Sequence, residues 1–239
     1  MKAVIYGANG AMGQLICGKL GDEVVGRVSI GGGNGAAKSF DELGIVDADV
    51  VVDFSHHSAV SEVLAYAKKI GAAAVIGTTG HTEAEKALVY EAAKEIPVFF
   101  SGNMRLGITV MCRLAKEAAK YFPDADIEIV EAHHNRKVDA PSGTALMLFD
   151  ALKEVRPNAV ANCGRTGECK RTKDEVGISS LRLGSVVGTH EVILHTGSQQ
   201  ITLKHEAITR AMFADGAVDA AQFMLGKPAG LYNMESMLG

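Results

Sequence analysis

The sequence lacks several features that would set it apart from ordinary globular proteins. Among its 239 residues, no apolar run reaches the roughly 18 to 20 residues that a membrane-spanning helix needs. The formal net charge is only -4 and no long run of one charge occurs, which argues against a general nucleic-acid binder. No internal repeat or low-complexity tract is present. With 47% hydrophobic residues, the chain can bury one large core or two smaller ones.

Cysteine is also scarce. The four cysteines, Cys17, Cys112, Cys163 and Cys169, are scattered along the chain. Cys163 and Cys169 could supply two metal ligands, but no second close pair accompanies them, so we expect ordinary reduced thiols. The opening residues MKAVIYGANG indicate a strand and a turn and lack the apolar region and cleavage site of a signal peptide. These features together predict a cytoplasmic protein.

A glycine motif follows the first apolar run. Gly7, Gly10 and Gly13 form GxxGxxG where a short β-prone segment gives way to helical spacing. Gly7 permits a tight turn, Gly10 lets a pyrophosphate approach the helix N-terminus, and Gly13 allows close packing of the helix on the strand. An ordinary glycine-rich turn is the alternative. The position directly after an N-terminal strand favours a dinucleotide site.

Alternating strands and helices continue to about residue 103. In order, the sequence predicts a strand over 22–30, a strand over 48–55, a helix over 58–71, a strand over 72–80, a helix over 81–95 and a strand over 96–103. This alternation predicts an α/β fold with a Rossmann-like, doubly wound parallel sheet. Ligands of such sheets bind beyond the carboxyl ends of the strands, where the segments DFS, GTTG and SGNM lie.

The acidic residue that usually follows the second strand of a dinucleotide-binding fold is missing. Ile30 stands about where a carboxylate would bond the ribose 2′-hydroxyl. Without that carboxylate, a 2′-phosphate meets less repulsion, and Arg27 or Lys38 could attract it. The choice between NADH and NADPH is therefore open at this stage.

The second half of the chain has a different pattern. The sequence predicts a helix over 107–122, a strand over 126–134, an antiparallel meander over 180–208 and a returning helical segment over 211–238. We therefore predict an α+β substrate-binding and oligomerisation domain with a mixed, largely antiparallel sheet over residues 104–211. Residues 1–103 and 212–239 would form the dinucleotide-binding domain.

The segment EAHHNRKVDAPSGTA, from Glu131 to Ala145, carries most of the candidate chemistry. His133, His134 and Lys137 could transfer protons or bind an anion, although each alone is more often structural or solvated. Pro141 suits the start of a helix. The N–H groups of the three following residues would form an anion site: Ser142, Gly143 and Thr144. A metal site that uses Glu131 and Asp139 with the histidines is a less favoured alternative.

These residues resemble the signature of the dihydrodipicolinate reductase family of lysine biosynthesis. The resemblance covers essentially the whole chain and includes GANGAMG, VDFS, GTTG, SGNM, GRTG, LRLGSVVGTHEV and GKPAGLYNM. It implies an enzyme that reduces 4-hydroxy-tetrahydrodipicolinate, via dihydrodipicolinate, with NADH, NADPH or both. It also implies a homotetramer and no resident metal.

The resemblance implies a role for individual residues. His133 and Lys137 would transfer protons, and a substrate carboxylate would bind at His134, Ser142, Gly143 and Thr144. The residues expected to contact the cofactor are Gly7, Ala8, Asn9, Gly10, Ala11, Met12, Gly77, Thr78, Thr79, Ser101, Gly102, Asn103 and Met104. Two alternatives remain: another two-domain NAD(P)-dependent dehydrogenase, or a sensor that binds a dinucleotide without catalysis.

Overall fold

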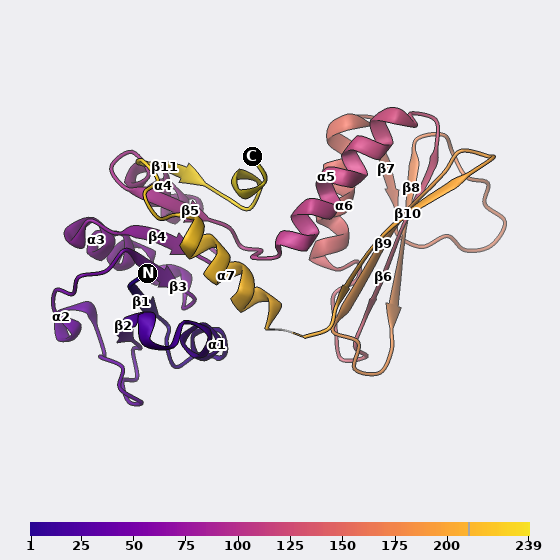
Figure 1. Cartoon of the computed structure of the whole chain (residues 1–239). Coiled ribbons are helices and arrows are strands. Elements are labelled where there is room, and N and C mark those ends of the chain that lie inside the picture. The colour runs from indigo at the N-terminus through magenta and orange to yellow at the C-terminus, as the bar shows by residue number, and fades with distance from the viewer. Residues whose placement is uncertain (210) are drawn as a thin grey trace. The chain divides into compact units, whose positions relative to one another are not determined.

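The structure is a computed structural model that describes residues 1–209 and 211–239 (Figure 1). The chain divides into two compact units. The first unit consists of Met1–Arg105 and Ala211–Gly239, and the second begins at Leu106 and includes the rest of the described chain. Each unit has its own β-sheet.

The first unit is built on a six-stranded sheet. In sheet order, its strands are β11 (Gly230–Tyr232), β5 (Pro97–Phe100), β4 (Ala73–Ile76), β3 (Val50–Asp53), β1 (Ala3–Tyr6) and β2 (Val24–Val28). Every neighbouring pair is parallel. All residues of β1, β3 and β4 are buried, as expected for strands covered on both faces. The predicted doubly wound sheet is confirmed.

Helices and short turns connect these strands. The elements are α1 (Ala11–Leu20), η1 (Gly21–Glu23), α2 (Phe40–Leu43), η2 (His57–Ala59), α3 (Val60–Ile70), α4 (Glu83–Ala92) and α7 (Met212–Phe223). Local chemistry sets their ends. α3 stops at Gly71, whose φ of 70° is in the left-handed region that favours glycine. α4 begins at a capping box in which Thr82 and Glu85 satisfy each other's backbone N–H groups.

The C-terminal segment is only partly helical. The sequence predicted helix throughout 211–238, and α7 matches the first part of that range. Gly230–Tyr232 instead forms β11, which pairs with β5 at the edge of the sheet, and a short turn of helix, η3 (Glu235–Leu238), follows. A strand of three residues is too short to show the alternation that predicts a strand. Pairing with β5, rather than a local sequence pattern, therefore forms β11.

The second unit contains a five-stranded mixed sheet. In sheet order, its strands are β10 (Gln200–Ala207), β9 (Gly188–His195), β6 (Asp126–His133), β8 (Glu175–Arg182) and β7 (Val160–Asn162). The pairs β10–β9 and β9–β6 are antiparallel, whereas β6–β8 and β8–β7 are parallel. The mixed sheet is confirmed. The meander predicted over 180–208 is wrong, because β6 lies between β8 and β9 and only β9–β10 forms a hairpin.

Two helices cover one face of this mixed sheet (Figure 1). They are α5 (Leu106–Tyr121) and α6 (Gly143–Val155). Strand β6 alternates strictly, with Ile127 and Ile129 buried against the helices and the residues between them half-buried. The same alternation carries Glu131 and His133 onto the helix side of the sheet. The apolar core and the polar cluster at its end therefore share one face.

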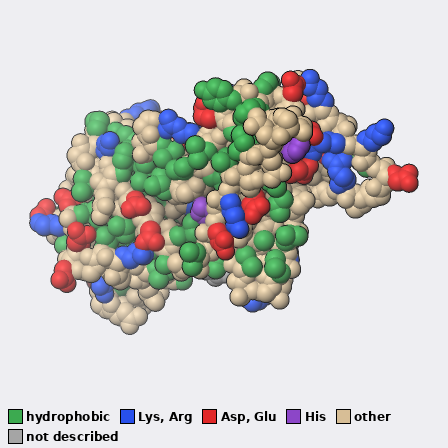
Figure 2. Space-filling model, turned by 45° about the vertical axis from the view of Figure 1, so that its right-hand side comes forward, with side chains coloured by type: hydrophobic (Ala, Val, Ile, Leu, Met, Phe, Trp, Pro, Cys, Tyr) green, Lys and Arg blue, Asp and Glu red, His purple; other side chains and the backbone are tan. Residues whose placement is uncertain are grey.

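Charged side chains are mixed over the surface. On the face drawn in Figure 2, acidic and basic side chains lie among one another rather than in regions of one sign. No helix among the described residues is long and apolar enough to cross a membrane.

Candidate active site

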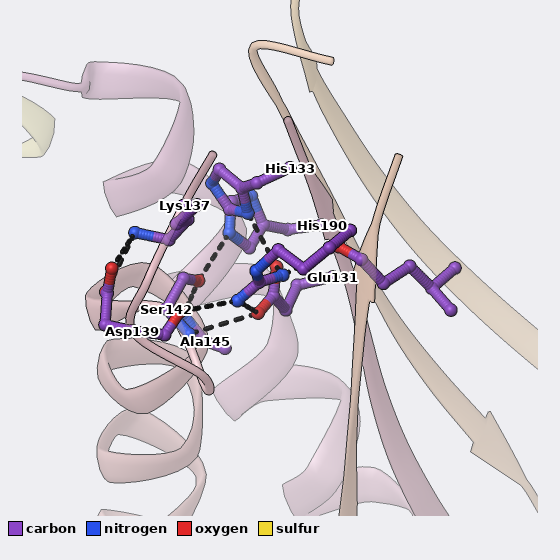
Figure 3. Close-up of polar contacts among 9 residues, drawn as sticks. Glu131, His133, Lys137, Asp139, Ser142, Ala145 and His190 are labelled. Atoms are coloured by element: carbon purple, nitrogen blue, oxygen red, sulfur yellow. Dashed lines mark hydrogen bonds and ion pairs between the residues drawn. The ribbon is translucent and has the colours of Figure 1, made fainter. Parts of the chain in front are cut away.

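The candidate active site of the second unit lies where β6 ends. His133 is the last residue of β6 and pairs with Arg182, the last residue of the parallel strand β8. The chain then runs through a loop to the N-terminus of α6 at Gly143. Figure 3 shows that side chains of β6, β9 and this loop converge at one place, and Arg182 of β8 joins them through its hydrogen bonds to Glu131. The signature segment thus supplies a strand end, a loop and a helix start to one cluster.

Glu131 is the centre of this cluster. Its side chain is fully buried, and each of its carboxylate oxygens accepts two hydrogen bonds. Oε2 lies 2.6 Å from His133 Nδ1 and 2.9 Å from an Arg182 nitrogen. Oε1 accepts from the second Arg182 nitrogen at 2.8 Å and from the Ser142 N–H at 3.1 Å. The bidentate arginine contact fixes the carboxylate plane.

These contacts keep Glu131 ionised. Burial raises the pKa of its carboxyl group, but the hydrogen bonds from Arg182 and His133 outweigh burial and lower the pKa to about 2. The same pairing raises the pKa of Arg182. At any pH near neutrality, the cluster therefore holds a buried carboxylate that can only accept hydrogen bonds.

A second histidine packs against His133. The rings of His133 and His190 meet edge to face, with centroids 5.1 Å apart. His190 comes from β9 and its Nε2 lies 3.1 Å from the Ser142 hydroxyl oxygen. Both rings are almost completely buried. His133 is therefore held on both sides, by a carboxylate and by an aromatic edge.

Ser142 has a structural role that the sequence did not reveal. The prediction that its N–H is free to bind an anion is wrong, because this N–H donates to Glu131. Its hydroxyl accepts from the Ala145 N–H and so caps α6. Gly143, the first residue of α6, has open space where a Cβ would stand. The helix start that could approach a ligand is therefore at Gly143, one residue later than Ser142.

The loop between β6 and α6 is held by its own charges. Lys137 Nζ lies 2.7 Å from one Asp139 carboxylate oxygen and 2.8 Å from the other, and the pair points away from Glu131 (Figure 3). The hydrogen bond from Lys137 lowers the pKa of the Asp139 carboxyl group. Arg182 also donates to the Asp139 carbonyl at 2.6 Å, and the Lys137 N–H donates to the His134 carbonyl. Lys137 is thus a charged group near the site, paired with an exposed carboxylate.

The glycine turn of the first unit fits a dinucleotide. A Cβ at Gly7 would lie 2.4 Å from the Phe54 carbonyl, and one at Gly13 would lie 2.1 Å from the Gly7 carbonyl. Gly13 therefore lets α1 pack closely on the turn after β1, and Gly7 lets this turn approach the end of β3. Gly10 is the N-cap of α1, no side chain caps this helix, and its first turn has no acidic residue. The N–H groups of the first helical turn suit a pyrophosphate.

The other expected cofactor segments lie at the ends of β4 and β5. Thr78 is buried, and its hydroxyl donates to Asp53 at 2.7 Å and accepts from the Ser55 N–H. Gly77 packs on the ring of Phe54 and leaves no space for a Cβ. These contacts join the ends of β3 and β4. The Thr78 side chain therefore stabilises the turn. A cofactor at this turn would contact the backbone or Thr79.

The segment SGNM after β5 is similarly held by hydrogen bonds and packing contacts. Ser101 donates its hydroxyl to the Asn103 carbonyl at 3.0 Å and accepts from the Asn103 N–H. Met104 is almost completely buried, and Gly216 of α7 packs against its carbonyl. Met104 therefore belongs to the core of the first unit, and Gly102 and Asn103 are the more accessible part of this turn.

A pocket of about 390 Å³ adjoins the glycine turn. It is lined by Ala8, Asn9, Gln14, Cys17, Gly18, Arg27 and Asn34. The Asn9 amide donates to the carbonyls of Gly32 and Gly33, which fixes the loop after β2 beside the turn. Ile30 lies after the end of β2 with 73% of its surface exposed, outside this lining. Among residues of the described chain, no His, Cys, Asp and Glu side chains group in a way that could hold a metal.

A doubly wound domain with this glycine turn, joined to a separate domain with a histidine and carboxylate cluster, defines a two-domain nicotinamide-dependent oxidoreductase. Two family models specify it further. The model "Dihydrodipicolinate reductase, N-terminus" matches residues 1–104, and "Dihydrodipicolinate reductase, C-terminus" matches residues 107–238. The chain belongs to the dihydrodipicolinate reductase family.

Curated relatives agree over the full length. The 4-hydroxy-tetrahydrodipicolinate reductase of Clostridium tetani is 41% identical over 249 residues, covering 100% of this chain and 97% of that protein. That of Caldanaerobacter subterraneus subsp. tengcongensis is 43% identical over 247 residues, covering 100% and 98%. The family resemblance inferred from the sequence motifs is confirmed.

Solved structures show the same fold. A dipicolinate-bound dihydrodipicolinate reductase from Paenisporosarcina sp. TG-14 matches with a TM-score of 0.83 and 24% identity, covering 98% of this chain and 97% of that one. A myo-inositol dehydrogenase from Corynebacterium glutamicum matches with a TM-score of 0.58 and 14% identity, covering 96% and 90%. The two-domain plan is therefore shared with dehydrogenases of other substrates.

Several residues of the cluster were missed as functional candidates by the sequence analysis. Glu131 was considered only as a metal ligand, and Arg182, Gly188 and His190 were not considered individually. Two of the family motifs, EAHH and LRLGSVVGTHEV, contain all four. Their proximity depends on the placement of β6 between β8 and β9. No local sequence pattern predicts this placement.

Proposed function

We propose that this chain catalyses the reduction of 4-hydroxy-tetrahydrodipicolinate, via dihydrodipicolinate, to tetrahydrodipicolinate in the diaminopimelate route to lysine. The observation that carries the proposal is the cluster of His133, Glu131 and Arg182 beside the start of α6. The full-length relatives, which are 4-hydroxy-tetrahydrodipicolinate reductases, support it. The related protein that binds dipicolinate supports a cyclic dicarboxylate as the ligand.

The start of α6 is the proposed place for a substrate carboxylate. Gly143 leaves open space above the first helical turn, and the helix N-terminus favours negative charge. Thr144 and His134 complete the proposed carboxylate site. Ser142 contributes indirectly, since it caps the helix and anchors it to Glu131.

The proposed chemistry needs one hydride and one proton. A reduced nicotinamide, when bound, supplies the hydride to C4 of the unsaturated ring. His133 supplies the proton to the neighbouring carbon, because an imidazole can carry a proton near working pH. Lys137 keeps a positive charge close to the site, which stabilises negative charge that develops on the substrate.

The first unit is the proposed dinucleotide-binding domain, and the second the substrate-binding domain. The turn from Gly7 to Met12 would hold the pyrophosphate, and the segments Gly77–Thr79 and Ser101–Met104 would line the remainder of the dinucleotide. The close packing at Gly7 and Gly77 and the uncapped start of α1 support this assignment. We propose NADH, NADPH or both as the reductant.

A coupled assay tests the reaction. Dihydrodipicolinate synthase generates the unstable substrate in place from pyruvate and aspartate semialdehyde, and the oxidation of NADH and NADPH is followed in parallel. We expect His133→Gln to lower kcat by about 100-fold or more with little change in KM, because a proton donor acts in the transition state. His195→Gln, an exposed histidine at the end of β9, is the matched control.

Two outcomes would contradict the proposal. Oxidation with sugar or amino-acid substrates but not with this one would identify another dehydrogenase on the same two-domain plan. Cofactor binding without turnover of any substrate would identify a dinucleotide sensor, which has no need of His133 or Lys137.

A further inference from the structure

We infer that Glu131 and Gly188 are positioning residues for His133. Glu131 holds the imidazole with its hydrogen on Nδ1, and Gly188 keeps the space beside Nε2 clear, so that Nε2 is the atom that handles the proton. This inference rests on the proposed function in one respect, since that function makes His133 the proton donor.

The contact geometry gives Glu131 this role. Glu131 and His133 lie two residues apart on the same face of β6, and Glu131 Oε2 is 2.6 Å from His133 Nδ1. The carboxylate is fixed in its plane, because Arg182 donates hydrogen bonds to both oxygens and the Ser142 N–H donates to Oε1. The orientation of His133 is thus set by a group that is itself fixed from β8 and from the start of α6.

The charge of Glu131 decides the tautomer. An ionised carboxylate only accepts hydrogen bonds, so Nδ1 of His133 must be the donor. In the neutral ring, Nε2 then carries the lone pair, and in the charged ring it carries the transferable proton. A histidine oriented in this way by a buried carboxylate is the arrangement that general acid–base catalysis uses in unrelated enzymes.

Gly188 protects the other side of the ring. A Cβ at Gly188, the first residue of β9, would lie 3.0 Å from His133 Nε2 and 3.4 Å from Cδ2. The φ of Gly188 is not positive, so backbone conformation gives no reason for glycine at this position. Close approach to the imidazole gives one. An added methyl group would cover the nitrogen that must meet the substrate.

The remaining charges around His133 come from three elements. Arg182 of β8 is neutralised by Glu131, and Lys137 of the loop is paired with Asp139. From β9, the ring of His190 faces His133 and is held by Ser142. Glu131 is therefore the carboxylate in direct contact with His133. Its removal should change the orientation and tautomer of the His133 ring.

The tautomer can be read directly by nitrogen-15 NMR of the histidines in the free protein. His133 is assigned by its loss in His133→Gln. We expect the neutral ring of the wild-type protein to carry hydrogen on Nδ1, and Glu131→Gln to shift the ring toward the Nε2–H form. A wild-type His133 with hydrogen on Nε2 would overturn the inference.

The split between kcat and KM gives a second readout. Because Glu131 acts through the orientation of His133, Glu131→Gln should lower kcat at least tenfold with little change in KM. Glu191→Gln, which removes a half-buried carboxylate from β9 that pairs with Lys204, should leave kcat unchanged. Equal losses of kcat in both variants would overturn the assignment.

Gly188→Ala tests whether the substrate needs open space beside His133 Nε2, and it removes no charge. We expect the Nδ1–H tautomer to persist while kcat falls at least tenfold and circular dichroism is unchanged. Full activity in Gly188→Ala would refute its role. The variant also keeps the inference testable if Glu131→Gln fails to fold. If the wild-type protein shows the Nδ1–H tautomer but reduces no substrate, the proposed function fails and the orientation of His133 by Glu131 stands.

Discussion

At the scale of single residues, Arg27 bears on the choice of cofactor. It lines the pocket beside the glycine turn. No acidic side chain lines this pocket, and its volume of about 390 Å³ is within the ordinary range for ligand sites. Lys38, the other cation suggested by the sequence, is not part of the lining. Arg27 is therefore the better placed cation for a 2′-phosphate.

Arg27→Ala should separate the two cofactors. We expect kcat/KM for NADPH to fall about tenfold, the cost of one charged hydrogen bond, and kcat/KM for NADH to change less than about twofold. Lys69→Ala, which removes an exposed cation of the same unit from a different pocket, is the matched control. An equal loss with both cofactors would instead show that Arg27 supports the fold or binds a part common to both.

Single residues also show where sequence reasoning stops. His133, Lys137 and Gly143 could be selected from the signature because their types suit proton transfer and anion binding. Ser142 could not be interpreted correctly, since its N–H is taken up by a carboxylate eleven residues earlier in the chain. Arg182 lies 51 residues after Glu131, and His190 lies 48 residues after Ser142. Both reach the cluster only through strand pairing.

At the scale of elements, the start of α6 is the place where we propose that a substrate carboxylate binds. Gly143 has open space around a Cβ and lies in the first turn of the helix. A side chain there would point toward the helix N-terminus, because Cα–Cβ bonds tilt in that direction. The position has room for a methyl group in the free protein, whereas the carboxylate that we propose to bind there would need the same space.

Gly143→Ala should therefore leave the fold intact and weaken substrate binding. We expect an unchanged or higher midpoint of urea unfolding, since alanine is the better helix former, and a KM for the dicarboxylate raised about tenfold. Gly18→Ala in α1, also with open space around its Cβ, should leave this KM unchanged. An unaltered KM in Gly143→Ala would place the carboxylate elsewhere.

Elements also differ in how well their patterns predict them. The parallel strands of the first unit are continuous apolar runs between amphipathic helices, and the sequence predicted each of them except β11. Strands β9 and β10 have the alternation of any half-exposed strand, which does not reveal their neighbours. The first four residues of β8 are all buried, so β8 lacks even this alternation over its first half. The crossover through α6 leads from β6 to β7, and β8 then pairs between these two strands, so the order β9–β6–β8 could not be predicted locally.

At the scale of the whole molecule, no helix of the second unit's described residues covers the second face of its sheet. The side chains of Val130, Ala132, Leu181 and Ile193 alternate with the residues packed on α5 and α6 and so point to this open face. Leu181 is 50% exposed. We propose that this face mediates the homotetramer that the family resemblance implies.

Light scattering tests the assembly. We expect a mass about four times the chain's 25.1 kDa at micromolar concentration, and Ile193→Glu should shift it toward the monomer by placing a charge in the interface. Leu88→Glu, on an exposed position of α4 in the first unit, is the control. A wild-type mass of one chain would contradict the proposal.

The sequence by itself determined the family, the doubly wound first domain and the segment that carries the candidate chemistry. Those features depend on local order: glycines at a strand end, apolar runs of a given period, and a long contiguous signature. Only the tertiary structure decided which groups surround His133, because Glu131, Arg182, Ser142 and Gly188 belong to three strands and a helix start. The hydrogen bonds that hold Glu131 charged and His133 oriented form only when those elements pack, so they have no counterpart in the linear chain.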